Sequence, residues 1–519
     1  MGPTFVPGEL VRNCGIANVR SGGEPFWSSM HTRFFFGAVF ALLSFAMILP
    51  ASASPWAEVG DNQLRADLEL LQAAGVVKVI TIAWPLPWES LRELSGADLA
   101  GQPATIRGAA QRVLARAQGA TASGVSAWAT VDLTNIPSLV YGFDGMGRGE
   151  GQAQLVLEGT DGPYSGRIAL GGITKSFGKK PNKIMPDGTY LSARLGWMRV
   201  YAGYLDHWWG PGQISALQLS NNARPMPQVG ISRSSTEVSS WPVVKWLGPW
   251  QFEFFLATMD GPQVQSNVRY SGAHLTISPL PGLEIGAAKT EQFCGQGHPC
   301  SPLRDYFINA DFSNHPDNVN GEGSLELKYS NVLGRVPFQV YAQIMNEDYS
   351  WLTRSGSSHL IGASIFLATA NNPVKLTAEF TDTFATKTPF SFGNYVYGFT
   401  YTNGQYPDGM RYRGRTLGAS LDTDATLLSL QGSWTDSAGR FYELSLHHAT
   451  IANSHTPPGY NIVSSEPVLV NMGEARVSLP FTLNHRTFKL DVAGRLQGDQ
   501  PYPHSGFSAA IEVALRAPL

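Results

Sequence analysis

The chain has 519 residues, of which 15% are charged and 43% hydrophobic, and its formal net charge at pH 7 is −3. A typical soluble domain carries roughly 25% charged residues, so neutral polar residues and the 55 glycines occupy many positions here. The near-neutral charge balance argues against a broadly basic surface, and we expect no nucleic-acid partner. The length suits several ordinary domains or one large barrel with a small appendage.

The N-terminus has the pattern of an export signal. The basic stretch Met30-His31-Thr32-Arg33 precedes the apolar run 34–49 and the A-x-A cleavage signature Ala51-Ser52-Ala53. We therefore expect residues 30–53 to be a signal peptide cut after Ala53, and residues 1–29 to be an upstream extension of doubtful biology. A retained membrane anchor is the alternative, but an apolar run of about 16 residues is short for a span that needs roughly 20.

Residues 54–124 contain segments with apolar residues at helical spacing, and we expect a small helical bundle there. Asp61 can cap a helix that ends near Gly75 and carries Leu64, Leu68 and Leu71 on one face. Two further helical segments cover residues 89–94 and about 105–118. Each segment is too short to be stable alone, so the three must pack on each other or on a larger body.

From about Val125 the hydrophobic period changes from 3.6 to 2 and stays at 2 to the end of the chain. In residues 507–516 the odd positions are apolar and the even positions are small or charged. The same alternation recurs in residues 325–329, 338–344, 374–380, 442–447 and 488–492. Alternating segments of about ten residues divided by turns are typical of a transmembrane barrel. We therefore predict an all-β antiparallel barrel over residues 125–519, with about 16 to 20 strands.

A soluble β-sandwich also alternates, and it is the alternative to a barrel. The alternation continues to the end of the chain without a second helical block, which is too long for one sandwich. Glu, Lys, Asp and Gln often stand mid-strand on the face opposite the apolar one, as a wet lumen requires. A strand at the end of the chain also suits a barrel that closes by pairing its first and last strands, although the final residue is Leu519 and not an aromatic one.

Two of the three cysteines, Cys294 and Cys300, flank a turn-rich stretch. In an exported chain such a pair predicts a disulfide that closes a small loop. A metal site with His298 as third ligand is the alternative, but no fourth ligand is recognisable, so we expect no metal. Cys14 lies in the segment that we expect to be discarded.

Catalytic signatures are missing from the sequence. The glycine-rich residues 145–151 precede an alternating segment and not a helix, so they predict a hairpin turn and not a nucleotide loop. His447, His448 and His455 lack the spacing of metal ligands, and no zinc-protease, Walker or nucleophile-elbow motif occurs. We expect no enzyme, no catalytic residues and no cofactor.

One stretch, residues 204–227, concentrates aromatic and planar polar side chains. Flat rings suit the C–H faces of a sugar, and acids, amides, His and Arg suit its hydroxyl groups. The candidate residues are Asp206, His207, Trp208, Trp209, Asn221, Asn222 and Arg224. Arg224 also suits the carboxylate of a uronic acid. The alternative is structural: Trp208 and Trp209 pack within the barrel, because aromatic residues near glycine more often pack than bind.

Four motifs together resemble the Wzi family of capsule assembly proteins, and they lie at residues 84–88, 206–212, 220–225 and 294–300. The resemblance covers essentially the whole mature chain in order. It implies an outer-membrane barrel of about 18 strands with an N-terminal helical bundle at its periplasmic end. It further implies a lectin-like role, in which extracellular loops hold exported capsular polysaccharide on the cell surface.

The leading hypothesis is a non-enzymatic, carbohydrate-binding protein of the outer membrane that attaches an acidic capsular or extracellular polysaccharide to the cell surface. Many weak contacts along a repeating polymer suffice for such retention. The expected partners are this polysaccharide, outer-membrane lipid and the polysaccharide secretion machinery. The rival hypotheses are a porin-like channel for sugar or polymer, and a secreted β-rich glycoside hydrolase or lyase.

Overall fold

The computed structural model describes residues 54–176, 183–298, 300, 319–347, 356–369, 372–453 and 460–519. The predicted extension, the signal peptide with its cleavage site after Ala53, and Cys14 lie outside these residues. The described residues up to Pro518 belong to one unit of the chain. Within them, no helix combines the length and the apolar character needed to cross a membrane.

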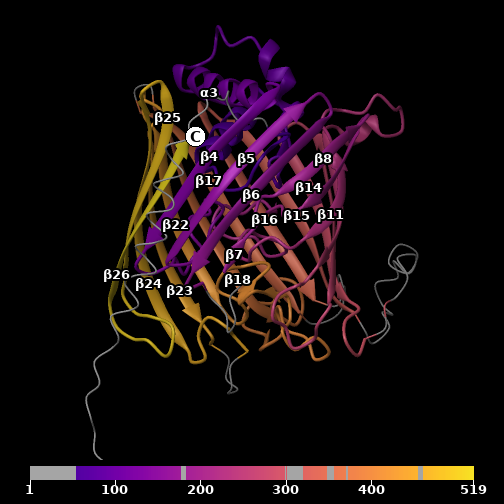
Figure 1. Ribbon diagram of the computed structural model, residues 1–519, viewed down its shortest axis with the longest axis vertical. Helices are drawn as coiled ribbons and strands as arrows, with labels where there is room; N and C mark the ends of the chain where they lie inside the picture. The colour runs from indigo at the N-terminus through magenta and orange to yellow at the C-terminus, as the bar shows by residue number, and fades with distance from the viewer. Residues whose placement is uncertain are drawn as a thin grey trace, which may run out of the picture. The chain divides into compact units, whose positions relative to one another are not determined.

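The described residues form a closed antiparallel barrel of 18 strands (Figure 1). The first strand, β4 (Gly124–Thr134), pairs with the last, β26 (Ser508–Pro518), so the sheet has no free edge. Both the barrel and its closure were predicted and are confirmed. The other strands of the ring are β5 (Gly151–Asp161), β6 (Tyr164–Thr174), β8 (Tyr190–Leu195), β9 (Met198–Gly203), β11 (Gln228–Arg233), β12 (Trp250–Thr258), β13 (Arg269–Leu280), β14 (Leu283–Phe293), β15 (Asn320–Leu333), β16 (Val336–Glu347), β17 (Ser357–Thr369), β18 (Asn372–Thr386), β22 (Thr426–Thr435), β23 (Phe441–Ile451), β24 (Val468–Leu483) and β25 (Arg486–Gln497).

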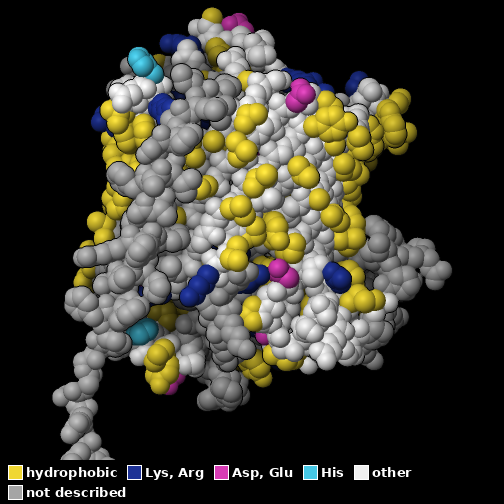
Figure 2. Space-filling model, viewed as in Figure 1, with side chains coloured by type: hydrophobic (Ala, Val, Ile, Leu, Met, Phe, Trp, Pro, Cys, Tyr) yellow, Lys and Arg dark blue, Asp and Glu magenta, His cyan; other side chains and the backbone are white. Residues whose placement is uncertain are grey.

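The wall alternates as the two-residue period predicts. On β15, Leu325 and Leu327 are exposed on the outer face, whereas Glu326 and Lys328 beside them are buried in the interior. Figure 2 shows hydrophobic side chains spread over the outer wall. The outer face therefore suits lipid, and the polar side chains of the wall point into the lumen.

The two ends of the barrel differ in the length of their connections. At one end, which we call the helix end, β13 ends at Leu280 and β14 begins at Leu283. At the opposite end, the loop end, β18 ends at Thr386 and β22 begins only at Thr426. In outer-membrane barrels the short turns lie on the periplasmic side and the long loops lie outside the cell.

The N-terminal residues form α2 (Asn62–Ala73), the 3-10 helix η1 (Trp88–Gly96) and α3 (Ala104–Thr121) at the helix end (Figure 1). Asp61 caps α2, as expected, by accepting a hydrogen bond of 2.9 Å from the backbone N–H of Leu64. The predicted face of Leu64, Leu68 and Leu71 lies in one buried cluster with residues of η1 and α3. The last helix ends at Thr121, three residues before β4 begins at Gly124.

Two short strand pairs connect this region further. The strand β1 (Trp56–Ala57) pairs with β3 (Leu86–Pro87), and β2 (Ala83–Trp84) pairs with β10 (Trp208–Trp209). Three more two-residue pairings occur in the loops: β7 (Ile184–Met185) beside β6, β19 (Tyr395–Val396) beside β18, and β20 (Arg411–Tyr412) with β21 (Arg415–Thr416). The pairing of β2 with β10 joins the N-terminal region to a connection of the barrel itself.

The second face of α2 is polar, yet it is buried as completely as the apolar one. Glu69 lies 2.5 Å from Nζ of Lys375 on β18 and 3.0 Å from Nε of Arg65 on its own helix. Gln72 donates to Glu284 of β14 at 2.5 Å. In a sequence, a polar helix face predicts contact with solvent. The polar face of α2 instead contacts the polar inner wall of the barrel. Ion pairs and hydrogen bonds thus clamp α2 to the lumen.

We expect Glu69→Gln to destabilise the folded barrel in a pH-dependent way. Burial raises the pKa of Glu69, but Lys375, Arg65 and Lys328 outweigh it, and the pKa is lowered from its ordinary value. A carboxyl group with a lowered folded pKa stabilises the protein above its unfolded pKa of about 4.3, and this contribution declines as the pH falls further. Near neutral pH the variant also leaves Lys375 buried without its carboxylate, at a cost of about 3 to 5 kcal/mol.

Denaturant unfolding in detergent at several pH values measures this difference between Glu69→Gln and the unmodified protein. The difference is expected to be full near pH 7 and to shrink below about pH 4. A difference that stays constant from pH 7 to well below pH 4 would contradict the assignment.

Candidate functional site

The connection between β9 and β11, residues 204–227, folds into the barrel, and we call it the first inner segment. Strands β9 and β11 pair directly in the wall, so the residues between them leave it and return. Residues Gln213 and Ser215 donate their backbone N–H groups to Glu379 of β18 at 2.6 and 2.8 Å. This segment contains all seven residues that the sequence singled out, and nearly every side chain in it is buried.

Trp208 and Trp209 are each 0% exposed. Trp208 donates from its indole N–H to the carbonyl of Gly212 at 2.9 Å, and its ring packs edge-on against Phe143 at 5.5 Å. Trp209 lies 5.5 Å from the ring of Phe255 and 4.9 Å from that of His274. A sugar could reach either ring only if the first inner segment were displaced.

His207 and Asp206 bind charged groups around the first inner segment. His207 Nε2 lies 3.2 Å from Glu253 of β12. Asp206 accepts a hydrogen bond of 2.8 Å from Arg148, and burial raises the pKa of its carboxyl although Arg148 acts in the opposite direction. Arg148 also donates to the backbone carbonyl of Asn221 at 2.7 Å. The guanidinium of Arg148 therefore links the two ends of the segment.

Asn222 and Arg224 are likewise engaged by neighbouring side chains. The Asn222 amide donates to the carbonyl and hydroxyl oxygens of Thr416, both at 2.9 Å, and accepts from Arg415 at 2.9 Å. Arg224 binds Asp187 through two nitrogens, with a shortest distance of 2.7 Å. The carboxylate that the sequence suggested for Arg224 is thus supplied by the protein in this structure.

A second connection, which lies between β18 and β22, also folds inward, and we call residues 395–425 the second inner segment. Its Tyr401 donates from the hydroxyl group to the carbonyl of Leu217 at 2.7 Å. The backbone N–H of Ser220 donates to the carbonyl of Leu417 at 2.7 Å. At Gly418 an added Cβ would lie 2.1 Å from the oxygen of Leu217, so only glycine permits this approach. The two inner segments interlock inside the lumen.

A polar cavity of about 240 Å³ remains beside the inner segments, against β4, β5, β6 and β26. Its lining includes Arg148, Arg167, Asp187, Asp206 and Arg516. A water molecule takes about 30 Å³ in the liquid, so the cavity holds several waters but not a passing polymer. No group of three or more His, Cys, Asp or Glu suited to a metal ion occurs among the described residues.

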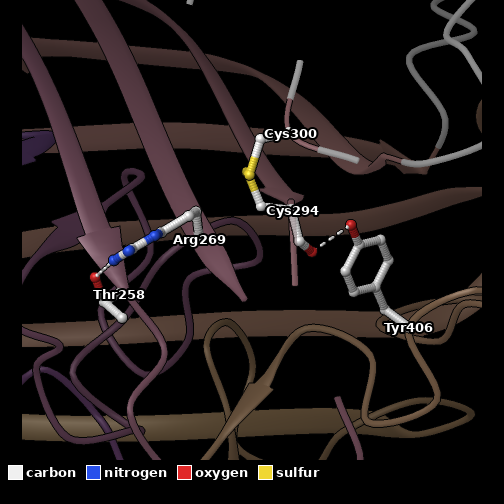
Figure 3. Close-up of a disulfide and its surroundings, with 5 residues drawn as sticks. All are labelled: Thr258, Arg269, Cys294, Cys300 and Tyr406. Atoms are coloured by element: carbon white, nitrogen blue, oxygen red, sulfur yellow. Dashed lines mark hydrogen bonds between the residues drawn. A yellow bond between two sulfur atoms is a disulfide. The ribbon is translucent and has the colours of Figure 1, made fainter. Parts of the chain in front are cut away.

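Cys294 and Cys300 are joined by a disulfide at the loop end, with their Cα atoms 4.4 Å apart (Figure 3). Tyr406 of the second inner segment donates from its hydroxyl group to the carbonyl of Cys294 at 3.0 Å. Its ring stacks on that of His298, with the ring centres 4.9 Å apart. Beside them, Arg269 binds the hydroxyl of Thr258 (Figure 3). The bridged loop is thereby fastened to the second inner segment.

Exposed aromatic rings occur at the loop end on positions that the sequence did not single out. They stand on the connections that follow β18, β23 and β25. We call them the loop-end aromatic surface: Phe390 (58% exposed), Phe392 (50%), Tyr460 (55%), Tyr502 (50%) and Phe507 (68%). Irregular loops have no hydrophobic period, so the only signal for these residues was aromatic rings next to turn residues, as in Tyr502-Pro503.

We expect Trp208→Ala to destabilise the barrel strongly, because it empties a filled site between the helices and the lumen. Loss of a buried tryptophan costs about 3 to 5 kcal/mol. Urea unfolding midpoints in detergent measure the change. Phe507→Ala is the matched control, and an exposed substitution of this kind changes stability by about 0.5 kcal/mol or less. Equal effects of the two substitutions would mean that Trp208 does not support the interior.

Three comparisons relate this chain to known proteins, and one of them compares the fold. The family model for the capsule assembly protein Wzi matches residues 112–497. A 55.8 kDa protein from the cps region of Klebsiella pneumoniae is 27% identical over 315 residues. These residues cover 59% of this chain and 60% of that protein, so the match spans less than two thirds of the relative's length. The structure of Wzi from Escherichia coli matches with a TM-score of 0.76 at 20% identity, over 89% of this chain and 99% of that one.

The Escherichia coli protein is described as an outer membrane protein involved in group 1 capsule assembly and as a carbohydrate-binding β-barrel. At 20% identity, the likeness to it shows a shared fold. The family model, in contrast, matches well over half of the chain, and it confirms the resemblance seen in the sequence. The chain belongs to the Wzi family of capsule assembly proteins, and its closed 18-stranded barrel lies in the outer membrane.

Proposed function

We propose that this protein binds capsular or extracellular polysaccharide at the cell surface and holds it there without transforming it. One observation carries the proposal: the lumen is filled by two interlocked inner segments, whereas exposed aromatic rings occur at the loop end. A filled interior favours binding at the rim over transport through the barrel. The carbohydrate binding described for Wzi of Escherichia coli supports the same function.

The orientation in this proposal follows from the connections. Short turns at the helix end favour a periplasmic position for the helices, and the loop-end aromatic surface then faces the polymer. Aromatic faces suit the C–H faces of sugar rings. Exposed cations at the loop end, Lys387 and Arg269, suit an acidic polymer. Each contact is weak, but a repeating polymer engages many copies at once, so their effects multiply.

The seven residues of the first inner segment act, in this proposal, as support for the loops and not as the surface that touches sugar. Their burial favours this role, because Asn222 and Arg224 already bind Thr416 and Asp187. The helices at the periplasmic end offer a surface to the secretion machinery.

We expect the combined variant Tyr502→Ser/Phe507→Ser to release part of the polysaccharide from the cell. Loss of two stacking rings weakens each protein–polymer contact, and the remaining contacts still hold a fraction of the polymer. The ratio of polysaccharide in the culture medium to that on cells measures retention. Tyr164→Ser removes an aromatic ring of similar exposure (65%) at the opposite end and is the control.

Heat-modifiability on a denaturing gel verifies that each of these variants folds. Unchanged retention in Tyr502→Ser/Phe507→Ser, and in a variant that also carries Phe390→Ser and Tyr460→Ser, would contradict the proposed surface.

Single-channel recording separates binding from transport. We expect the purified protein to show no steady openings in planar bilayers, because the inner segments and α2 occupy the lumen. Porin-like conductance under the same conditions would favour a channel.

A separate assay tests for hydrolysis. Incubation of the protein with polysaccharide is expected to release no reducing ends, and their release would favour a hydrolase.

A further inference from the structure

The connection between β11 and β12 differs from the other barrel hairpins that the structure describes at the helix end. Strand β11 ends at Arg233 and β12 begins at Trp250. In contrast, β5 ends at Asp161 and β6 begins at Tyr164, and the longest of the other turns spans only residues 436–440. Short turns are the rule on this side of outer-membrane barrels, so a long insertion here needs a physical reason.

The tip of this connection is apolar and exposed. Trp241 is 66% exposed, Val243 79% and Trp246 67%. Figure 1 shows a connection beside β11 that extends sideways from the wall at the level of the helices, and Figure 2 shows hydrophobic side chains gathered on that side. Large apolar side chains exposed together in a short stretch mark a site of interaction with a membrane or another protein.

The base of the connection holds the tip in one shape. The backbone N–H of Thr236 donates to the hydroxyl of Ser90 in η1 at 2.9 Å. Lys245 donates its backbone N–H to the carbonyl of Trp241 at 2.9 Å and begins the 3-10 helix η2 (Lys245–Leu247). Gly248 has φ +67°, and an added Cβ would lie 1.9 Å from the oxygen of Ser278. The chain therefore returns to the wall through a position that only glycine fits.

The apolar tip continues the lipid-facing surface of the barrel. Trp197, in the adjacent hairpin between β8 and β9, is 55% exposed and lies 6.2 Å from the ring of Trp250 at the end of the connection. Leu195, on the same hairpin, is 61% exposed. Tryptophan beside lysine, as at Trp246 and Lys245, is the composition of segments that lie at a membrane–water boundary.

We propose that residues 241–246 insert into the lipid leaflet that surrounds the helix end, as an anchor beside the barrel. The partner is a phospholipid surface, with the rings at the boundary between headgroups and acyl chains. The anchor stands on one side of the barrel only, so it fixes the depth of the barrel and its tilt in one direction. This inference is independent of polysaccharide binding.

A fluorescent probe on Val243→Cys tests the proposal in phosphatidylethanolamine–phosphatidylglycerol vesicles. An environment-sensitive dye at this site is expected to be quenched by nitroxide-labelled lipid and to be several-fold less accessible to aqueous iodide than an exposed turn. Ser437→Cys is the matched aqueous control, because Ser437 lies in the exposed turn after β22 at the same end. Leu191→Cys is the lipid control, at a wall position that is 72% exposed.

Each labelled protein is first tested for heat-modifiability, which verifies that the barrel is folded. Strong iodide quenching at Val243→Cys, equal to that at Ser437→Cys and without quenching by labelled lipid, would overturn the proposal. That result would instead favour a periplasmic protein as the partner of the tip.

Discussion

The rest of this structure depends on one interaction. Carboxylates of the barrel wall accept hydrogen bonds from the backbone N–H groups of the segments that fold into the lumen. Glu379 accepts the backbone N–H groups of Gln213, Ile214 and Ser215 at 2.6 to 3.1 Å. Irregular backbone inside a protein must find partners for its N–H groups, and an ionised carboxylate offers several acceptor positions at once. An 18-stranded barrel without such partners would enclose water, as porins of this size do.

Hydrogen bonds from backbone N–H groups to wall carboxylates also occur at other places in the lumen. Glu284 accepts the backbone N–H of Thr81 at 2.7 Å, just before the strand β2 that pairs with β10. Glu347 accepts the N–H of Tyr401 at 2.5 Å, in the second inner segment. Three wall carboxylates thus bind three separate parts of the chain, and the inserted parts then bind each other. The filling of the lumen is therefore specified by the wall and is not a loose collapse of loops.

The sequence predicted the barrel because alternation is a property of each strand by itself. The alternation of Leu325 and Leu327 with Glu326 and Lys328 suffices to tell the lipid face from the lumen face. It did not predict that α2 has two buried faces, because Arg65 and Glu69 look like any solvent-facing pair at i and i+4. What makes them buried is Lys375, which is distant in sequence and lies on β18.

The candidate site was predicted only in part, for a related reason. The density of Trp208, Trp209 and Asn222 marked the first inner segment as unusual, and this segment does occupy the lumen. Composition could not tell contact with sugar from contact with Phe255 or Thr416, since a planar group serves both. Phe390 and Phe507 remained unnoticed, because exposure of a loop residue depends on which neighbours fold inward and leave it at the rim.

Burial of the inner segments and exposure of the loop-end rings are two aspects of one arrangement. Tyr406 donates a hydrogen bond to the carbonyl of Cys294 and stacks on His298, so the bridged loop and the second inner segment stabilise each other. A loop held in this way loses little conformational freedom when it binds, and preorganisation of this kind strengthens weak contacts. The contacts that close the channel therefore also fix this described part of the rim, and in the function proposed here a preorganised rim suits the retention of a polymer better than an open pore does.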